Sequence, residues 1–247
     1  MELPALSPND KASPRVATRH ATGVRHMLFA FTLTALAHSL PAAELDGVLA
    51  RVDKAGASFK GMSAHVVQVS HTAVINEDNN SSGTILLKRT HPRDMRMLVD
   101  FTQPDPKTVA FQGRKVEIYF PKINTVQEYD VGKSRELLDE FFLVGFGTSR
   151  ADLESAYKLR LAGTDNIGGQ KTDRLELIPK SKEVLNHLTK LEIWVAENGY
   201  PVQQKFYEPA GDYMVFTYSD MKINPELSES ALKLHLPKNV KREYPQK

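Results

Sequence analysis

The sequence contains no cysteine and a single tryptophan. The lack of cysteine excludes disulfides, thiolate nucleophiles and zinc-thiolate sites, so the stability of the fold has to come from an apolar core. The chain also lacks an excess of one charge, with 32 basic and 30 acidic residues. A balanced charge provides no field that would concentrate a polyanion, and we therefore expect no nucleic-acid partner.

Long hydrophobic runs are absent too. The longest uncharged apolar run covers residues 27–37, which is shorter than the ~20 residues that cross a bilayer. Three arginines lie ahead of it and small residues follow it. This order is typical of a secretory signal, so we predict a signal peptide over residues 1–43 that is cleaved near Ala43. Ser39 is a second candidate cleavage position, and an uncleaved anchor or a buried core helix is the alternative.

Residues 44–247 remain as one expected domain, because their length suits a single substantial core. The removed segment holds four basic and two acidic residues, so the remaining domain is electrically neutral. Its first residue, Glu44, is not the cysteine of a diacylglyceryl-linked lipoprotein. We therefore expect the domain to be free in solution outside the inner membrane.

The expected secondary structure changes from helical to extended soon after the signal. An amphipathic opening helix is predicted by apolar residues at helical spacing, namely Leu45, Val48, Leu49, Val52 and Phe59. From about Ser63 the apolar period falls to two, which predicts short antiparallel strands. The expected strands cover residues 64–75, 84–89, 93–101, 108–112, 115–120, 123–131, 157–163, 172–178, 190–195, 202–208, 212–219 and 231–236. The expected turns lie at residues 79–83, Gly113, Pro121 and 211–212.

The alternation is clearest in residues 93–101, where Met95, Met97, Val99 and Phe101 share one face. About a dozen strands are too many for a flat sheet, because large twisted sheets curl beyond ~10 strands. We therefore predict a mainly β fold with some α structure. Its centre is a curled antiparallel sheet, an incomplete β-barrel, with an apolar concave face.

One apolar stretch, residues 134–147, interrupts the extended pattern midway. It is rich in leucine and phenylalanine, and we predict that it is helical. Ser149, with Asp152 three residues later, predicts the capping box of a second, short helix. The stretch suits a helical lid over the concave face, and a helix that caps an ordinary barrel end is an equal alternative.

The sequence shows no recognisable set of reactive side chains. His65 and His71 are about 20 Å apart along an extended strand, which is too far to share a metal ion. A Gly-x-Ser-x-Gly elbow and a phosphate-binding glycine-rich loop are both missing. Carboxylates are plentiful on the polar strand faces, so a pair of catalytic carboxylates of the glycosidase type remains an alternative. We expect no enzymatic activity, no metal site and no cofactor.

Short motifs follow one another along the chain. Residues 83–89, Gly-Thr-Ile-Leu-Leu-Lys-Arg, precede Met95-Arg-Met97, and residues 113–121 read Gly-Arg-Lys-Val-Glu-Ile-Tyr-Phe-Pro. Ile223-Asn-Pro225 and Leu234-His-Leu-Pro237 follow near the end of the chain. In this order the motifs resemble those of the LolA-type outer-membrane lipoprotein carriers and their lipoprotein-sorting relatives. The resemblance covers essentially all of residues 44–247.

In that family, an incomplete barrel with a helical lid encloses a cavity for the acyl chains of lipoproteins. The resemblance, together with the strand faces and the apolar mid-chain stretch, predicts the following groove residues: Ile85, Leu87, Met95, Met97, Val99, Phe101, Phe111, Val116, Ile118, Leu137, Leu138, Phe141, Phe142 and Phe146. By strand alternation, Arg89 shares a face with Ile85 and Leu87. The resemblance implies that Arg89 hydrogen-bonds carbonyl groups of the lid and holds the empty cavity closed.

The resemblance also implies the ligand and the partners. The ligand would be the acyl chains of lipoproteins or a free lipid, received from an inner-membrane donor complex and passed to an outer-membrane acceptor. The protein would be periplasmic and is expected to be a monomer. A regulatory or sensor module of the same fold, which detects lipoproteins or receives a protein segment, is the alternative.

Overall fold

The structure is a computed structural model that describes residues 41–91, 94–132 and 144–245. All of these residues belong to the compact unit Ser39–Lys247. Within the described ranges, no helix is long and apolar enough to span a membrane. The predicted signal peptide, residues 1–43, lies almost wholly outside these ranges and stays a prediction.

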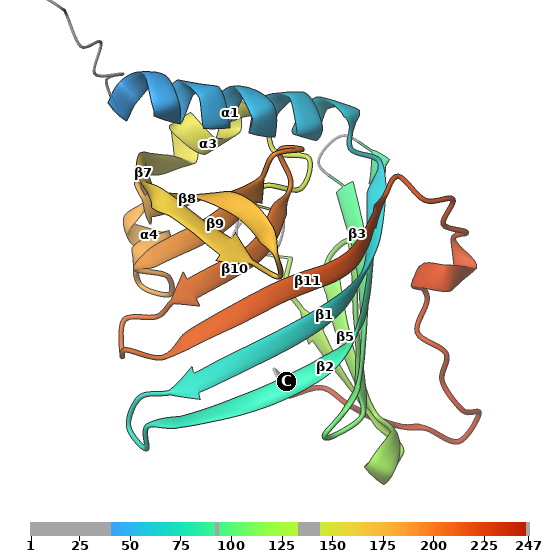
Figure 1. The fold of residues 1–247 in the computed structure, drawn as a ribbon. Helices are drawn as coiled ribbons and strands as arrows, with labels where there is room; N and C mark the ends of the chain where they lie inside the picture. The colour runs from blue at the N-terminus through green and yellow to red at the C-terminus, as the bar shows by residue number, and fades with distance from the viewer. Residues whose placement is uncertain (1–40, 92–93, 133–143, 246–247) are drawn as a thin grey trace, which may run out of the picture. The chain divides into compact units, whose positions relative to one another are not determined.

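A single sheet of 12 strands forms most of the described chain. The strands are β1 (Gly61–Thr72), β2 (Glu77–His91), β3 (Asp94–Gln103), β4 (Lys107–Gln112), β5 (Lys115–Phe120), β6 (Thr125–Asp130), β7 (Tyr157–Ile167), β8 (Gln170–Pro179), β9 (Lys190–Ala196), β10 (Pro201–Tyr207), β11 (Tyr213–Ile223) and β12 (Lys241–Glu243). They lie in the order β12-β6-β5-β4-β3-β2-β1-β11-β10-β9-β8-β7, and the end strands β12 and β7 are not paired with each other. Figure 1 shows the strong curvature of this open sheet. The predicted curled, incomplete barrel is confirmed.

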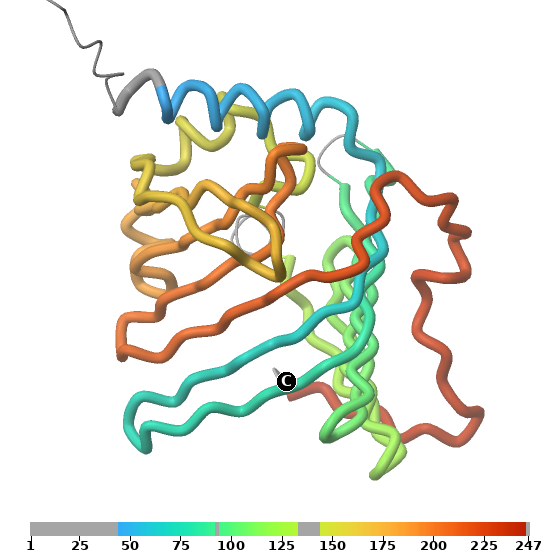
Figure 2. The backbone as a smooth tube through the Cα atoms, in the orientation of Figure 1, coloured from blue at the N-terminus to red at the C-terminus, as the bar shows by residue number. Residues whose placement is uncertain are grey.

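The described helices are short apart from the first one. They are α1 (Pro41–Ser58), α3 (Arg150–Ala156) and α4 (Lys182–Leu185), with 3-10 turns η1 (Pro121–Ile123) and η2 (Ser230–Leu232). The backbone N–H groups of Ser149 and Asp152 each donate to the other residue's side chain at 3.1 Å, which confirms the predicted capping box. Helix α1 lies across one end of the sheet, with α3 beneath it (Figures 1 and 2).

The turn predicted at residues 79–83 is wrong. Strand β2 runs through these residues, and the chain reverses at residues 73–76, where Asn76 has a φ of 52°. Strand β1 accordingly ends at Thr72. Gly83 permits a close approach of strands, because a Cβ there would lie 1.9 Å from the Asp100 carbonyl oxygen. The prediction took this glycine as evidence of a turn, whereas in the structure it allows the tight pairing of β2 with β3.

The strand predicted at residues 231–236 is also wrong. This segment contains η2 and then irregular chain, and it crosses the convex face of the sheet. Side-chain hydrogen bonds hold this segment and the chain just before it, in place of strand pairing. Gln112 donates to the Leu232 carbonyl and Lys88 to the Leu227 carbonyl, both at 2.7 Å. The last strand is β12, which pairs in parallel with β6.

Two main clusters of buried apolar side chains lie on the concave face. In one, Val48, Leu49 and Val52 of α1 and Leu153 of α3 pack against strands β7 to β10. In the other, on strands β1 to β5, the α1 side contributes only Ala55 and Phe59. The described helices therefore fill one half of the concave face and leave the other half less covered.

Candidate functional site

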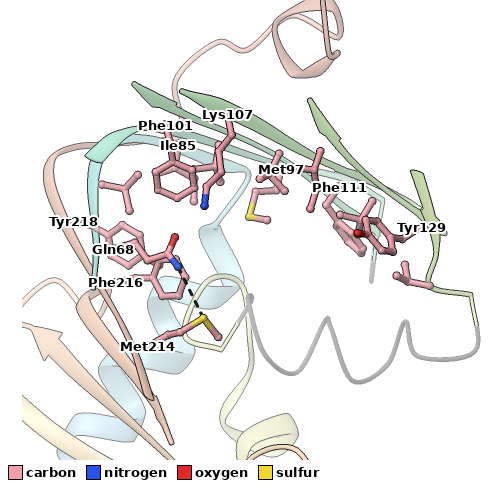
Figure 3. A pocket seen from close by; sticks show the side chains of 16 residues that line it. Gln68, Ile85, Met97, Phe101, Lys107, Phe111, Tyr129, Met214, Phe216 and Tyr218 are labelled. Atoms are coloured by element: carbon pink, nitrogen blue, oxygen red, sulfur yellow. Dashed lines mark hydrogen bonds between the residues drawn. The ribbon is translucent and has the colours of Figure 1, made fainter. Parts of the chain in front are cut away.

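The less covered half of the concave face contains a cavity of about 440 Å³. Its lining residues are Val66, Gln68, Ile85, Met97, Val99, Phe101, Lys107, Val109, Phe111, Val116, Ile118, Tyr129, Val131, Met214, Phe216 and Tyr218. Aliphatic, aromatic and methionine side chains dominate this lining (Figure 3). The volume lies within the range of roughly 300–1,000 Å³ that is usual for small-molecule pockets.

Seven of the predicted groove residues line this cavity: Ile85, Met97, Val99, Phe101, Phe111, Val116 and Ile118. Strand register explains why they come together. Ile85, Val99, Val109 and Ile118 form one row of paired residues across β2 to β5. Next to this row, Leu87, Met97, Phe111, Val116 and Tyr129 form a second one across β2 to β6. Side chains in the same row share one face of a sheet, so both rows face the cavity side.

The other lining residues were not among the predicted ones, and of these Met214, Phe216 and Tyr218 form one wall. They alternate along β11, and this alternation was already visible in the predicted strand 212–219. What the sequence did not show is that β11 pairs with β1, where Phe216 lies opposite Gln68. Pairing between strands so far apart in the chain is what brings this wall to the cavity.

The remaining predicted groove residues form two groups. Three of them do not line the cavity, and four lie outside the described residues. Leu87, Met95 and Phe146 are buried in the apolar cluster beside it. Leu137, Leu138, Phe141 and Phe142 lie outside the described residues, and so does most of the predicted lid helix. Their place in the groove stays a prediction.

Residues 144–147 belong to the stretch 134–147 that was predicted to be helical, and for these four residues the prediction is wrong, because they form turns. Gly145 and Gly147 have φ values of 88° and 76°, which a right-handed helix does not accommodate. The buried Gln204 side chain donates to the Val144 carbonyl at 2.7 Å. Phe146 packs edge-on against Tyr218 of the cavity wall, with 5.5 Å between ring centroids. This turn is therefore held against the inner face of the sheet.

Arg89 lies at the same turn. Its guanidinium donates to the Gly147 carbonyl and, at 3.4 Å, to the Gly56 carbonyl near the end of α1. It also lies 5.9 Å from the centre of the Phe59 ring. The arginine thus connects α1 to the chain that follows the predicted lid. Whether these bonds hold an empty cavity closed stays a prediction.

Most polar groups of the cavity wall are already hydrogen-bonded within the protein. Burial raises the pKa of Tyr218, so the phenol stays neutral, and its O–H donates to the Gln204 Oε1 at 2.6 Å. The Gln68 amide donates to the Ser70 hydroxyl at 2.9 Å. Lys107 is the only charged residue of the described lining. The described lining can therefore bind an apolar molecule.

Residues 57–235 match the family model described as outer membrane lipoprotein carrier protein LolA. This match covers well over half of the chain. The chain belongs to the LolA family. The resemblance stated from the motifs is therefore confirmed, and the family description is that of a carrier. A search of curated proteins found no match.

Three solved structures are similar to this chain at low sequence identity. A conserved protein of Thermus thermophilus is 16% identical, with a TM-score of 0.50 over 81% of this chain and 99% of its own. MucB is 16% identical, with a TM-score of 0.48 over 78% of this chain and 63% of MucB. A lipoprotein-sorting protein domain of Vibrio parahaemolyticus is 15% identical, with a TM-score of 0.40 over 76% of this chain and 94% of its own.

Proposed function

We propose that this LolA-family protein is a periplasmic carrier that shields acyl chains in its cavity. The chains belong to a lipoprotein or to a free lipid, and the protein passes them from an inner-membrane donor to an outer-membrane acceptor without covalent chemistry. The observation that supports this proposal best is the apolar cavity of about 440 Å³ on the concave face. Membership of the LolA family supports it as well.

Burial of alkyl groups supplies the driving force for this function. Each methylene transferred from water contributes about 0.8 kcal/mol, so ten buried methylenes contribute on the order of 8 kcal/mol before the costs of association. Met97 and Met214 suit a ligand of variable shape, because an unbranched thioether adapts to irregular surfaces. Release requires that the protein also stabilise its empty state, and Arg89 is our candidate for that role through its bonds to Gly147 and Gly56.

The test fills the cavity by mutation. Val109 points into the cavity, whereas its neighbour Thr108 is on the opposite face and donates to Asp100 at 2.8 Å. Val109→Trp should weaken the binding of a fluorescent apolar probe at least tenfold, because the indole occupies the space of the ligand. Thr108→Trp is the matched control and should leave the probe affinity unchanged.

The probe should also be displaced from the parent protein by long-chain lipid. Equal probe affinity in folded Val109→Trp and Thr108→Trp proteins would contradict the cavity as the binding site. If a protein segment displaces the probe and lipid does not, the result would contradict the carrier function and favour the alternative, a sensor module.

A further inference from the structure

One charge lies within the apolar lining. Lys107 is the first residue of β4 and alternates with Val109 and Phe111 on the cavity side of that strand. It is paired across the strands with Phe101, and its ammonium lies 5.1 Å from the centre of the Phe101 ring. Figure 3 shows its nitrogen turned toward the cavity.

Among the described residues, no carboxylate oxygen lies within 4.0 Å of the Lys107 ammonium, so the ammonium forms no salt bridge with them. The acidic residues near it in the sequence form their hydrogen bonds with other residues, although the charge of Lys107 adds, after that of Lys122, to the lowered pKa of Asp105. Asp105 pairs with Lys122, and Asp100 accepts from Thr108 on the convex face. Both acids are exposed, whereas Lys107 is half-buried. An unpaired ammonium next to a low-dielectric surface attracts anions more strongly than one that is fully in water.

The position of Lys107 within the cavity matters as much as its charge. Strand pairing places Val66, Gly83, Phe101 and Lys107 in one row across β1 to β4. The neighbouring inner rows toward α1 contain Val99 and Val109, and then Met97 and Phe111. An alkyl chain that runs parallel to β3 and β4, across these rows, would have its polar end beside Lys107.

We infer that Lys107 is a headgroup site, and that the cavity takes amphiphiles that carry an anion at one end of an alkyl chain. This inference rests on the proposed function and narrows its ligand class. The shared chemistry is a carboxylate or a phosphate that accepts charge-assisted hydrogen bonds from the ammonium. A fatty acid supplies the first of these anions, and a phospholipid supplies the second.

The experiment compares three ligands whose chains have twelve carbons: dodecanoate, dodecyl phosphate and the neutral monododecanoyl glycerol. Each competes with an uncharged apolar probe for the full mature protein at constant ionic strength. We expect at least one anionic ligand to bind about tenfold more tightly than the neutral one, which is the effect of a single charge-assisted bond. The anion that shows this preference identifies the headgroup chemistry.

Lys107→Met should abolish the preference, because methionine retains an apolar stem of similar length and has no ammonium. Lys107→Arg should retain it. Lys115→Met is the matched control: this exposed lysine lies on β5 and pairs with Glu128 on the convex face, so its loss should leave the preference intact.

The outcomes separate the two proposals. Equal affinity of the parent for all three ligands, or a preference that survives in Lys107→Met, would overturn the headgroup site and leave the apolar cavity in place. In that case, Lys107 only covers Phe101 with its stem while its amine stays in water. A parent protein that binds none of the three ligands and not the probe would overturn the proposed function itself.

Discussion

Replacing Arg89 with leucine isolates the bonds that connect the turn at Gly147 to helix α1. The change keeps an apolar stem of similar bulk and deletes the donors to the Gly147 and Gly56 carbonyls. A hydrogen bond from a charged group contributes about 1.5–3 kcal/mol, and Arg89 is only half-buried, so we assign about 2 kcal/mol to the pair. If these bonds exist only when the cavity is closed, their loss changes the ratio of open to closed protein roughly thirtyfold.

The assay measures loading and delivery separately. Arg89→Leu should take up an apolar probe at least as well as the parent protein, and it should transfer a bound lipid to acceptor vesicles more slowly, because the empty state has lost its stabilisation. Lys88→Leu is the control, since Lys88 lies on the same strand but donates to Leu227 on the convex face. Normal transfer by a folded Arg89→Leu protein would refute the role of Arg89 in closing the empty cavity and make it a structural residue.

Two further predictions concern stability. Gln204→Leu should lower the free energy of unfolding by about 2–3 kcal/mol in urea denaturation, because it leaves the Val144 carbonyl and the Tyr218 hydroxyl without their partner in a buried site; an unchanged midpoint would show that this contact does not hold the turn. The hydrogen bond from Arg160 lowers the pKa of Glu176, so its stabilisation is present above the unfolded-state pKa and is lost as the pH falls through the lower, folded-state pKa. Glu176→Gln should remove this part of the acid sensitivity, and an equal stability difference between parent and variant at neutral and acid pH would contradict it.

Strand alternation predicted much of the cavity because it is a local property. Met97, Val99 and Phe101 share a face whatever their strand pairs with, and the same holds for Val116 and Ile118. The partner of each strand is not local. Two walls of the cavity meet only because β1 pairs with β11, and no pattern in the sequence specifies that register.

Glycines account for other differences between prediction and structure. A glycine indicates backbone freedom, but the sequence does not show which kind. Gly83 allows two strands to approach, and Gly145 and Gly147 adopt positive φ values in the turns at residues 144–147. The role of Arg89 came from the resemblance to the family, since a strand-end arginine more often packs its stem on the core and reaches solvent with its guanidinium. Its bonds to Gly147 and Gly56 depend on tertiary packing, which the local sequence does not show.

The binding of an uncharged alkyl ligand tests the central claim most directly. Calorimetric titration of lipid-free protein at several temperatures measures the stoichiometry and the heat-capacity change together. We expect saturation at one ligand per cavity, with a negative heat-capacity change from burial of apolar surface. Val109→Trp should abolish that heat. The absence of saturable binding to the parent protein, or binding with no heat-capacity change, would contradict the assignment of the cavity as a site for acyl chains.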